Sequence, residues 1–287
     1  MIEKHILNLG AGVQSTTLYL MSMEGLVQRF DTCIFADTGE EPAAVYRHLE
    51  WLQSLDGPPI LVRSIGSRLG EDLRYGLKPT SSGKQRRFAS IPAFTIIDGQ
   101  EPGIKPRQCS RDYKLDVIGR SIRRDVLGLQ ARERTPKDIK IYQYFGISWD
   151  ERSRASRIWE RFHVTEESKY EPIFPFVDRQ WTRANCLEWL EGRVPHEVPR
   201  SACVFCPFHT DQEWQRLKDR GGEDWARAVE IDHVLRTTGA VANRDMRQTM
   251  YVHRSCKPID EVDFRPHINS KELQLGFGVE CEGVCGV

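Results

Sequence analysis

The sequence predicts an α/β fold, a doubly wound and mostly parallel sheet, followed by a smaller helical part that carries cysteines. Three short apolar runs alternate with two helix-like stretches in the first 62 residues. This β-α-β-α-β order is typical of a parallel sheet. A glycine-bearing loop joins the first strand to the first helix, and a further strand-like run begins at residue 141. We therefore expect an α/β domain over residues 1–170 and a helical, cysteine-bearing region over residues 171–287.

The loop after the first strand is the first candidate for a ligand site. Ile6, Leu7 and Leu9 form the pattern of a buried strand, and a helix-like stretch follows over residues 15–23. Glycine lets the backbone approach a ligand, and the free N–H groups and dipole of a helix start favour an anion. An ordinary tight turn is the alternative, because the loop has neither a Walker nor a dinucleotide glycine pattern. The pattern predicts a phosphate or sulfate site with these residues: Gly10, Ala11, Gly12, Gln14, Ser15 and Thr16.

The second strand pattern, over residues 32–36, ends at Asp37, Thr38 and Gly39. A carboxylate and a hydroxyl at the carboxyl end of a strand lie where open α/β sheets bind ligands. The first two strands therefore predict one shared site at an edge of the sheet.

The remaining elements are predicted from periodicity and from turn residues. Residues 75–106 carry five Lys or Arg side chains among Gly, Ser and Pro, which favours a long basic loop, either a lid or a solvated excursion. Further strands are expected over residues 60–62 and 141–147, and an extended link over residues 172–176. Further helices are expected over residues 43–55, 107–127, 182–190 with Thr182 as N-cap, around Trp214, and over 225–235.

Composition restricts the class of protein. The chain has 287 residues, with 41 basic and 41 acidic side chains, so net charge gives no sign of a nucleic-acid partner. No apolar stretch reaches the roughly 20 residues of a membrane span. The N-terminus leads directly into a strand, which argues against a secretory signal and for a cytoplasmic protein. In that compartment the eight cysteines are expected to be metal ligands or redox groups rather than disulfides.

Four stretches in order resemble the PP-loop, or adenine nucleotide α-hydrolase, superfamily, and within it the phosphoadenylylsulfate (PAPS) reductase-like family. They are the loop from Gly10 to Ser15, the Asp37-Thr38-Gly39 sequence, the stretch from Cys109 to Lys114 with Arg111, and Gly146 with Glu151 and Arg154. The resemblance implies a Rossmann-like PP-loop domain that binds an adenine nucleotide at these residues.

The chain also departs from the family pattern. Gln14 stands where ATP-splitting members usually have an acidic residue, and Gly10 replaces the leading serine. Cys109 is followed by Ser110, where iron–sulfur reductases have two adjacent cysteines. The tail carries Cys281 and Cys285 without the histidine that follows the nucleophilic cysteine of those reductases.

The Cys-x-x-Cys pair of Cys203 and Cys206 is compatible with zinc, an iron–sulfur cluster or a dithiol. The resemblance implies Cys109 as a third ligand. We expect a tail cysteine as the fourth ligand, Cys281 or else Cys285, with the other free as a catalytic thiol. We expect a [4Fe–4S] cluster rather than Zn²⁺, and a cluster with three protein ligands is the alternative. Cys33, Cys186 and Cys256 are expected to be core or surface residues rather than ligands. His209 and His253 are expected to have packing roles, and a role as ligand or proton carrier is the alternative.

The resemblance implies sulfur chemistry that depends on an adenine nucleotide. We expect ATP-dependent adenylation of an acceptor, with release of pyrophosphate, followed by sulfur transfer. Lys114 and Arg154 are catalytic candidates that would neutralise phosphate charge together with Arg111, and Asp37 would position Mg²⁺ or a ribose hydroxyl. One alternative is a PAPS reductase in which thiolate Cys281 or Cys285 forms sulfite, and another is a non-enzymatic, zinc-stapled nucleotide-binding module. Basic residues in 75–106 and 120–124 favour a nucleic acid over a small metabolite as acceptor, and a sulfur donor or reductant is required; a homo-oligomer is left open.

Overall fold

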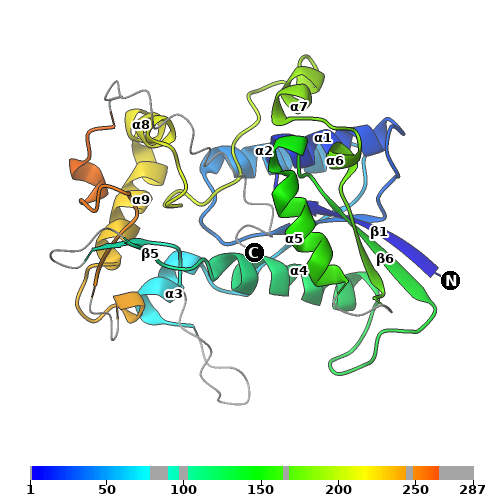
Figure 1. Cartoon of the computed structure of the whole chain (residues 1–287), viewed down its shortest axis with the longest axis horizontal. Helices are drawn as coiled ribbons and strands as arrows, with labels where there is room; N and C mark the ends of the chain where they lie inside the picture. Colours follow the sequence, from blue (N-terminus) through cyan, green and yellow to red (C-terminus); the bar gives the residue numbers. More distant parts are fainter. Residues whose placement is uncertain (1, 78–89, 97–102, 164–167, 244–247, 265–287) are drawn as a thin grey trace.

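A computed structural model describes residues 2–77, 90–96, 103–163, 168–243 and 248–264. Its main sheet confirms the α/β prediction, because all five strands are parallel and their order is β3-β2-β1-β6-β7 (Figure 1). The strands are β1 (Ile2–Leu9), β2 (Thr32–Ala36), β3 (Ile60–Arg63), β6 (Ile139–Phe145) and β7 (Tyr170–Ile173).

Helices cover both faces of this sheet, which makes it doubly wound. Successive residues of a strand point to opposite faces, so Ile6 and Leu7 of β1 enter different core clusters, and both are fully buried. The face of Leu7 is covered by α1 (Val13–Met23), α2 (Ala43–Ser54), α6 (Pro175–Asp178) and α7 (Arg183–Leu190). The face of Ile6 is covered by η1 (Ser110–Leu115), α4 (Asp116–Ser121), η2 (Ile122–Val126) and α5 (Arg152–Phe162).

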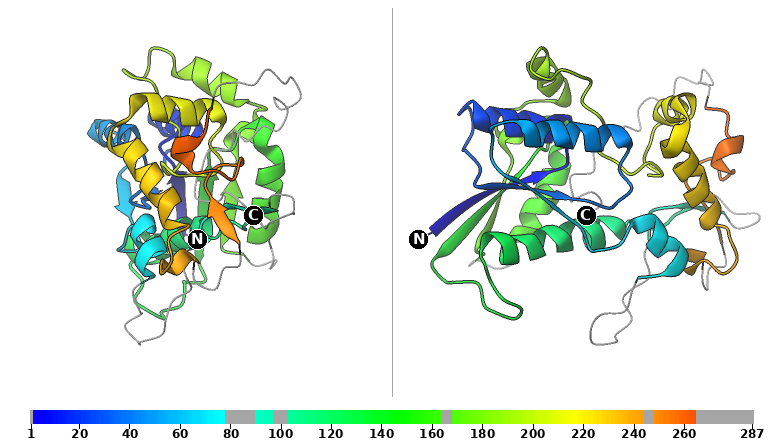
Figure 2. Two further views of the ribbon diagram at one scale, coloured as in Figure 1. Left: turned by 90° about the vertical axis from the view of Figure 1, so that its left-hand side faces the viewer. Right: turned by 180° about the vertical axis from the view of Figure 1, so that it is seen from behind.

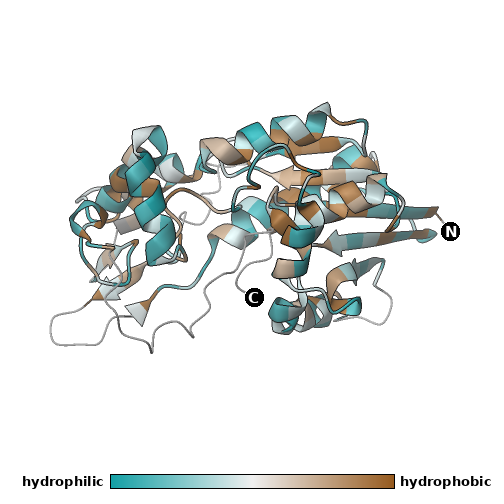
Figure 3. Ribbon diagram, turned by 90° about the horizontal axis from the view of Figure 1, so that it is seen from above, coloured by the Kyte–Doolittle hydropathy of each residue, from teal (hydrophilic) through white to brown (hydrophobic). Residues whose placement is uncertain are grey.

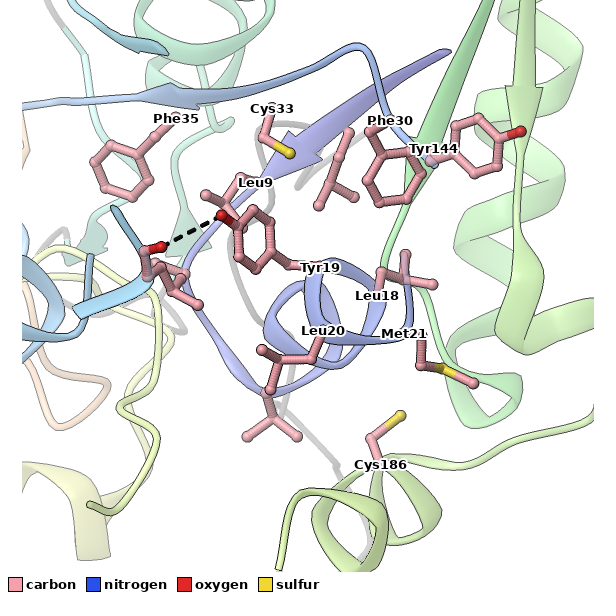
Figure 4. Close-up of a cluster of buried hydrophobic side chains, with 14 of the residues drawn as sticks. Leu9, Leu18, Tyr19, Leu20, Met21, Phe30, Cys33, Phe35, Tyr144 and Cys186 are labelled. Carbon is pink, nitrogen blue, oxygen red and sulfur yellow. Dashed lines mark hydrogen bonds between the residues drawn. The ribbon is translucent and has the colours of Figure 1, made fainter. Parts of the chain in front are cut away.

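The core between α1 and the sheet depends on segments far apart in the sequence (Figure 4). Tyr19 of α1 is buried among leucines, and its hydroxyl donates hydrogen bonds to the carbonyl oxygens of Leu52, at 3.3 Å, and Pro58, at 3.2 Å. Cys33 of β2 and Cys186 of α7 are fully buried in the same cluster, so their predicted packing roles are confirmed. Thr182 accepts from the N–H of Asn185, as expected of the N-cap of α7.

The segment after residue 170 first completes the sheet. Residues 172–176 were expected to form an extended link, and this expectation was wrong, because they contribute to β7 and to the short helix α6. The strand Tyr170–Ile173 is stabilised by parallel pairing with β6. The mixture of Pro, Ile and Phe in this stretch gives no strand pattern, so the sequence did not indicate this pairing. The expected domain boundary at residue 170 thus falls within a strand, and α7 packs on the core of the main sheet.

A second part of the molecule packs around Trp214, which is fully buried. It contains α3 (Leu69–Tyr75), α8 (Asp211–Arg220), α9 (Gly222–Val234) and the turn η5 (Ile259–Glu261). It also contains an antiparallel sheet of order β5-β4-β8, formed by Gly103–Ile104, Phe94–Ile96 and Thr249–Tyr251. The expectations of a loop over 75–106 and of a purely helical second part were therefore incomplete. These strands of two or three residues are too short to show a period-two pattern, and residues 78–89 and 97–102 lie outside the described part.

The two parts lie side by side (Figures 2 and 3), and Glu40 joins them. Its carboxylate is fully buried and pairs with Arg227 of α9 at 2.7 Å and with Arg68 at 3.5 Å. Its carbonyl oxygen accepts the N–H of Val204 at 2.8 Å. Because a buried charge requires partners, this network holds the loop after β2 against the second part. Among the described helices, none has the combination of length and apolar character that crossing a membrane requires.

Candidate functional site

Three of the predicted site segments follow neighbouring strands of the main sheet. β1 lies between β2 and β6, and the direction in which the chain adds strands reverses between β1 and β6. In open α/β sheets ligands bind at such a switch point, outside the carboxyl ends of the strands. The loop at Gly10, the Asp37 sequence and Gly146 all begin there, so the fold brings together residues that lie more than a hundred positions apart.

The Gly10 loop turns two backbone donors toward one centre. Ala11 adopts φ +59°, in the left-handed region, and this tight turn is fully buried. The N–H groups of Gly10 and Gly12 both donate to the Ser15 hydroxyl, each at 3.3 Å. Gly12 is the N-cap of α1, so the positive end of the helix dipole lies at this centre. Such an arrangement suits an anionic oxygen in the position that the Ser15 hydroxyl partly fills.

Thr16 differs from the other predicted loop residues. Its hydroxyl forms a 2.8 Å hydrogen bond with Nε2 of His48, so the side chain is directed toward α2. His48 is fully buried, and its Nδ1 forms a 2.8 Å hydrogen bond with Nε2 of the exposed His196. Burial, with the charge of His196 in addition, lowers the pKa of His48 from 6.5 to about 4. Thr16 thus connects the first turn of α1 to α2. The prediction that it contacts a ligand rested on its position in the sequence alone.

Gln14 of α1, Arg154 of α5 and Glu151, the N-cap of α5, come together in a buried cluster. The Gln14 amide donates to Glu151 at 3.2 Å and to the Ser148 hydroxyl at 3.4 Å. Arg154 donates to the other Glu151 oxygen at 3.1 Å. Burial raises the pKa of Glu151, and the neighbouring Arg154 opposes that shift. Within the described residues, Oε1 of Gln14 has no hydrogen-bond partner, so this cluster presents an acceptor for a ligand donor.

Asp37 is held in place by two donors. One of its carboxylate oxygens accepts the N–H of Gly39 at 2.7 Å and the hydroxyl of Tyr46 at 2.8 Å. Burial and the adjacent Asp37 charge raise the pKa of Tyr46, which keeps that hydroxyl protonated. Gly39 has φ +74°, and a Cβ there would lie 2.8 Å from the Arg68 side chain, so glycine is required. The predicted Asp-Thr-Gly sequence is therefore a fixed turn.

Lys114 and Cys203 form a second cluster with two residues of the same turn. The Lys114 ammonium pairs with Glu41 at 3.1 Å, and the two side chains are 6% and 0% exposed. The Thr38 hydroxyl and the Cys203 sulfur are in hydrogen-bond contact at 3.2 Å. Burial and the Glu41 charge raise the pKa of the Cys203 thiol, while Lys114 and Thr38 act in the opposite direction. The thiol is therefore neutral in this arrangement.

A pocket beside this cluster brings the three predicted metal ligands together. Cys109, Cys203 and Cys206 all line it, although they come from segments about ninety residues apart. Ser110 also lines it, and among the described residues its buried hydroxyl has no hydrogen-bond partner. No set of three His, Cys, Asp or Glu side chains in the described part has the geometry to hold a metal ion. Cys281 and Cys285 lie outside the described residues.

Sequence reasoning did not single out several residues of these clusters. They include Glu41, which pairs with Lys114, and Ser148, which accepts from Gln14. They also include Arg107, whose Cζ lies 3.9 Å from the centroid of the Phe208 ring in the lining of the pocket. The acidic pair after Asp-Thr-Gly was an available signal, because acids at the carboxyl end of a buried strand are seldom incidental. Arg111, in contrast, is exposed, and its charge acts on Arg161 of α5, while its predicted role at the nucleotide stays a prediction.

The chain was compared with known proteins. It is 24% identical over 264 residues to an uncharacterized 37.8 kDa protein in the gpa 5′ region of Escherichia phage 186, an alignment that covers 80% of this chain and 75% of that protein. No protein-family model matches the chain, and no solved structure matches it significantly. The fold and the site together define an α/β protein with polar clusters at the switch point of a parallel sheet.

Proposed function

We propose that the protein is a PP-loop enzyme of the PAPS reductase-like type, which uses ATP to activate an acceptor for sulfur transfer. An acceptor oxygen would attack the α-phosphorus of ATP and release pyrophosphate. A sulfur donor at the oxidation level of sulfide would then form the carbon–sulfur bond, with AMP as the leaving group. Activation is needed because an oxo or hydroxyl oxygen leaves poorly from carbon, whereas AMP leaves readily.

One observation carries the proposal: two backbone N–H groups converge on the Ser15 hydroxyl at the start of α1. This centre lies after the central strand, at the switch point, where parallel sheets bind nucleotides. A phosphate oxygen would receive the donors that now bind Ser15, while the serine hydroxyl rotates to donate as well.

The charged residues support phosphate chemistry at the same edge. Arg154 and Lys114 are buried cations, each paired with one glutamate, so each charge is held in a fixed position. Preorganised cations stabilise charge that develops on a transferring phosphoryl group. Asp37 is a carboxylate at a strand end, a residue type that binds Mg²⁺ together with nucleotide phosphates.

The pocket cysteines fit an iron–sulfur cluster in the kind of donor they offer. The three thiols line the same pocket, and Lys114 and Arg107, which also line it, would balance the negative charge of a thiolate-bound cluster. Cys203 would have to lose its proton, as any thiol does on binding a metal. Such a group supplies either a sulfur atom or electrons when bound. Cys109, Cys203 and Cys206 would hold it, and a fourth ligand from the tail remains our expectation.

Calorimetry of purified protein with ATP, GTP and PAPS tests the nucleotide assignment. We expect ATP to bind most tightly; preferred binding of PAPS would favour sulfonucleotide reduction instead. Incubation with ATP, sulfide and mixed RNA should then release AMP and pyrophosphate. Formation of ADP and orthophosphate would contradict adenylation, because that outcome places the cleavage at the γ-phosphate.

A further inference from the structure

A row of arginines runs along α5 away from the candidate site. Arg154, Arg157 and Arg161 are spaced i, i+3 and i+7, so they lie on one side of the helix. Arg154 is 4% exposed and reaches Glu151, whereas Arg157 and Arg161 are exposed. At about 1.5 Å of rise per residue, the row extends for roughly 10 Å from the buried cluster to the surface. Figure 1 shows α5 at the front of the molecule.

Arg111 joins the exposed end of this row from η1. Burial lowers the pKa of Arg161, and the like charges of Arg111 and Arg157 add to that shift, so both cations lie near enough to Arg161 to act on it. Within the described residues, none of the three lies within ion-pair distance of a carboxylate. We call Arg111, Arg157 and Arg161 the arginine track. Three clustered cations without a counter-charge leave a local positive potential that a polyanion would relieve.

We propose that the arginine track binds the phosphate backbone of a nucleic-acid strand, which is the acceptor of the sulfur chemistry. The inference rests on the proposed function, because it names the substrate class of the same site. Guanidinium groups bind phosphates in a bidentate manner, and contacts to phosphates position a strand without reading its sequence. A strand on the track would reach the Gln14–Glu151–Arg154 cluster at its buried end, where a base could meet the activated centre.

The shape of the charged surface favours a strand over a membrane. The exposed Ser156 and Glu160 precede Arg157 and Arg161 on α5, so an uncharged and an acidic side chain lie directly beside the track. Two of the basic residues that the sequence suggested for this role form hydrogen bonds elsewhere. Arg123 donates to Thr135 and to the carbonyl oxygen of Glu133, and Arg120 donates to the carbonyl oxygen of Asp116.

The test is fluorescence anisotropy of the full chain with labelled single strands of about 20 nucleotides, as RNA and as DNA of the same sequence, without ATP. The double variant R157Q/R161Q should raise Kd about tenfold near 100 mM salt and reduce the slope of log Kobs against log salt by about 2. The matched control is R216Q/R220Q, two exposed arginines with the same i, i+4 spacing on α8. That control should leave both quantities unchanged, and the RNA and DNA arms identify the kind of strand.

Three results would overturn the inference: no binding of either strand, an equal effect of the α8 variant, or anionic phosphatidylserine vesicles that bind through the same two arginines. The affinity of R157Q/R161Q for ATP is measured in parallel and should be unchanged. Failure of the track with ATP binding intact would leave the proposed function standing. Absence of ATP binding by the unmodified protein would instead remove the proposed function, whatever the oligonucleotides do.

Discussion

The Gly10 loop and the cysteine pocket lie at the same sheet edge but are built differently. The loop is a local structure, in which Ala11, Gly12 and Ser15 form the turn and its hydrogen bonds within six residues. The pocket is assembled from the turn after β2, the start of η1 and the Cys203–Cys206 segment. Donors in the loop are already oriented, whereas the half-buried Cys203 thiol has a raised pKa and keeps its proton. The Gly10 loop is therefore preorganised to bind an anion, whereas the cysteines of the pocket must lose protons before they can bind a metal.

The largest expected effect is the loss of bound metal when a cysteine of the pocket is replaced. Replacement of Cys203 by Ala should abolish bound iron and acid-labile sulfide in anaerobically purified protein, because a cluster that loses a ligand loses most of its binding free energy. Cys109→Ala and Cys206→Ala should do the same, whereas Cys33→Ala in the core of the main sheet should retain the metal. Iron and sulfide analysis with visible absorbance checks this. Stoichiometric zinc without sulfide, or colour that survives in Cys203→Ala, contradicts the cluster.

The next effect concerns the buried ion pair of the pocket. Lys114→Ala breaks the pair with the fully buried Glu41 carboxylate, and breaking a buried ion pair should lower the free energy of unfolding by about 3–5 kcal/mol. The double variant Lys114→Met with Glu41→Gln removes both charges and should recover most of that loss. Urea unfolding measures both variants. If Lys114 also neutralises phosphate charge, the stable double variant should still release no pyrophosphate; full turnover in it would assign the pair to structure alone.

How much of this could be foreseen from the sequence depends on the range of each interaction. The loop, β2, β3 and the cap at Thr182 were predictable because local apolar patterns and turn residues specify them. β4, β5 and β8 were not, since these strands of two or three residues exist only through their pairing, and the pairing of β4 with β8 joins segments about 150 residues apart. The pairing of Lys114 with Glu41 and the contact of Thr38 with Cys203 were equally hidden. Such contacts depend on tertiary packing that no periodicity reports.

The free energy of unfolding should depend on pH because of His48, which is buried next to the Gly10 loop and contacts Thr16. Its pKa is lowered from 6.5 to about 4, so between these values the unfolded chain binds a proton that the folded protein does not. The contribution of His48 to stability is therefore complete above pH 6.5 and is lost as the pH falls toward 4, by up to about 3 kcal/mol. Urea unfolding from pH 7.5 to 4.5 measures the slope. His48→Gln should flatten it, and an unchanged slope in that variant would place the titration elsewhere.

The smallest expected effect tests the loop directly. Ser15→Ala removes one donor, and Gly12→Ala places a methyl group beside the N–H that would face phosphate. Each should weaken ATP binding by about 1–3 kcal/mol, the cost of leaving a buried polar partner unsatisfied. The matched controls are Gly119→Ala, where a Cβ meets nothing within 4 Å, and Ser54→Ala, whose hydroxyl donates to the carbonyl oxygen of Trp51 in its own helix. Calorimetry should show the loss in the loop variants and not in the controls. Unchanged affinity for ATP in both loop variants would show that the two converging N–H groups only close a turn. The Gly10 loop would then not be a preorganised anion site, and it would no longer differ in this respect from the cysteine pocket.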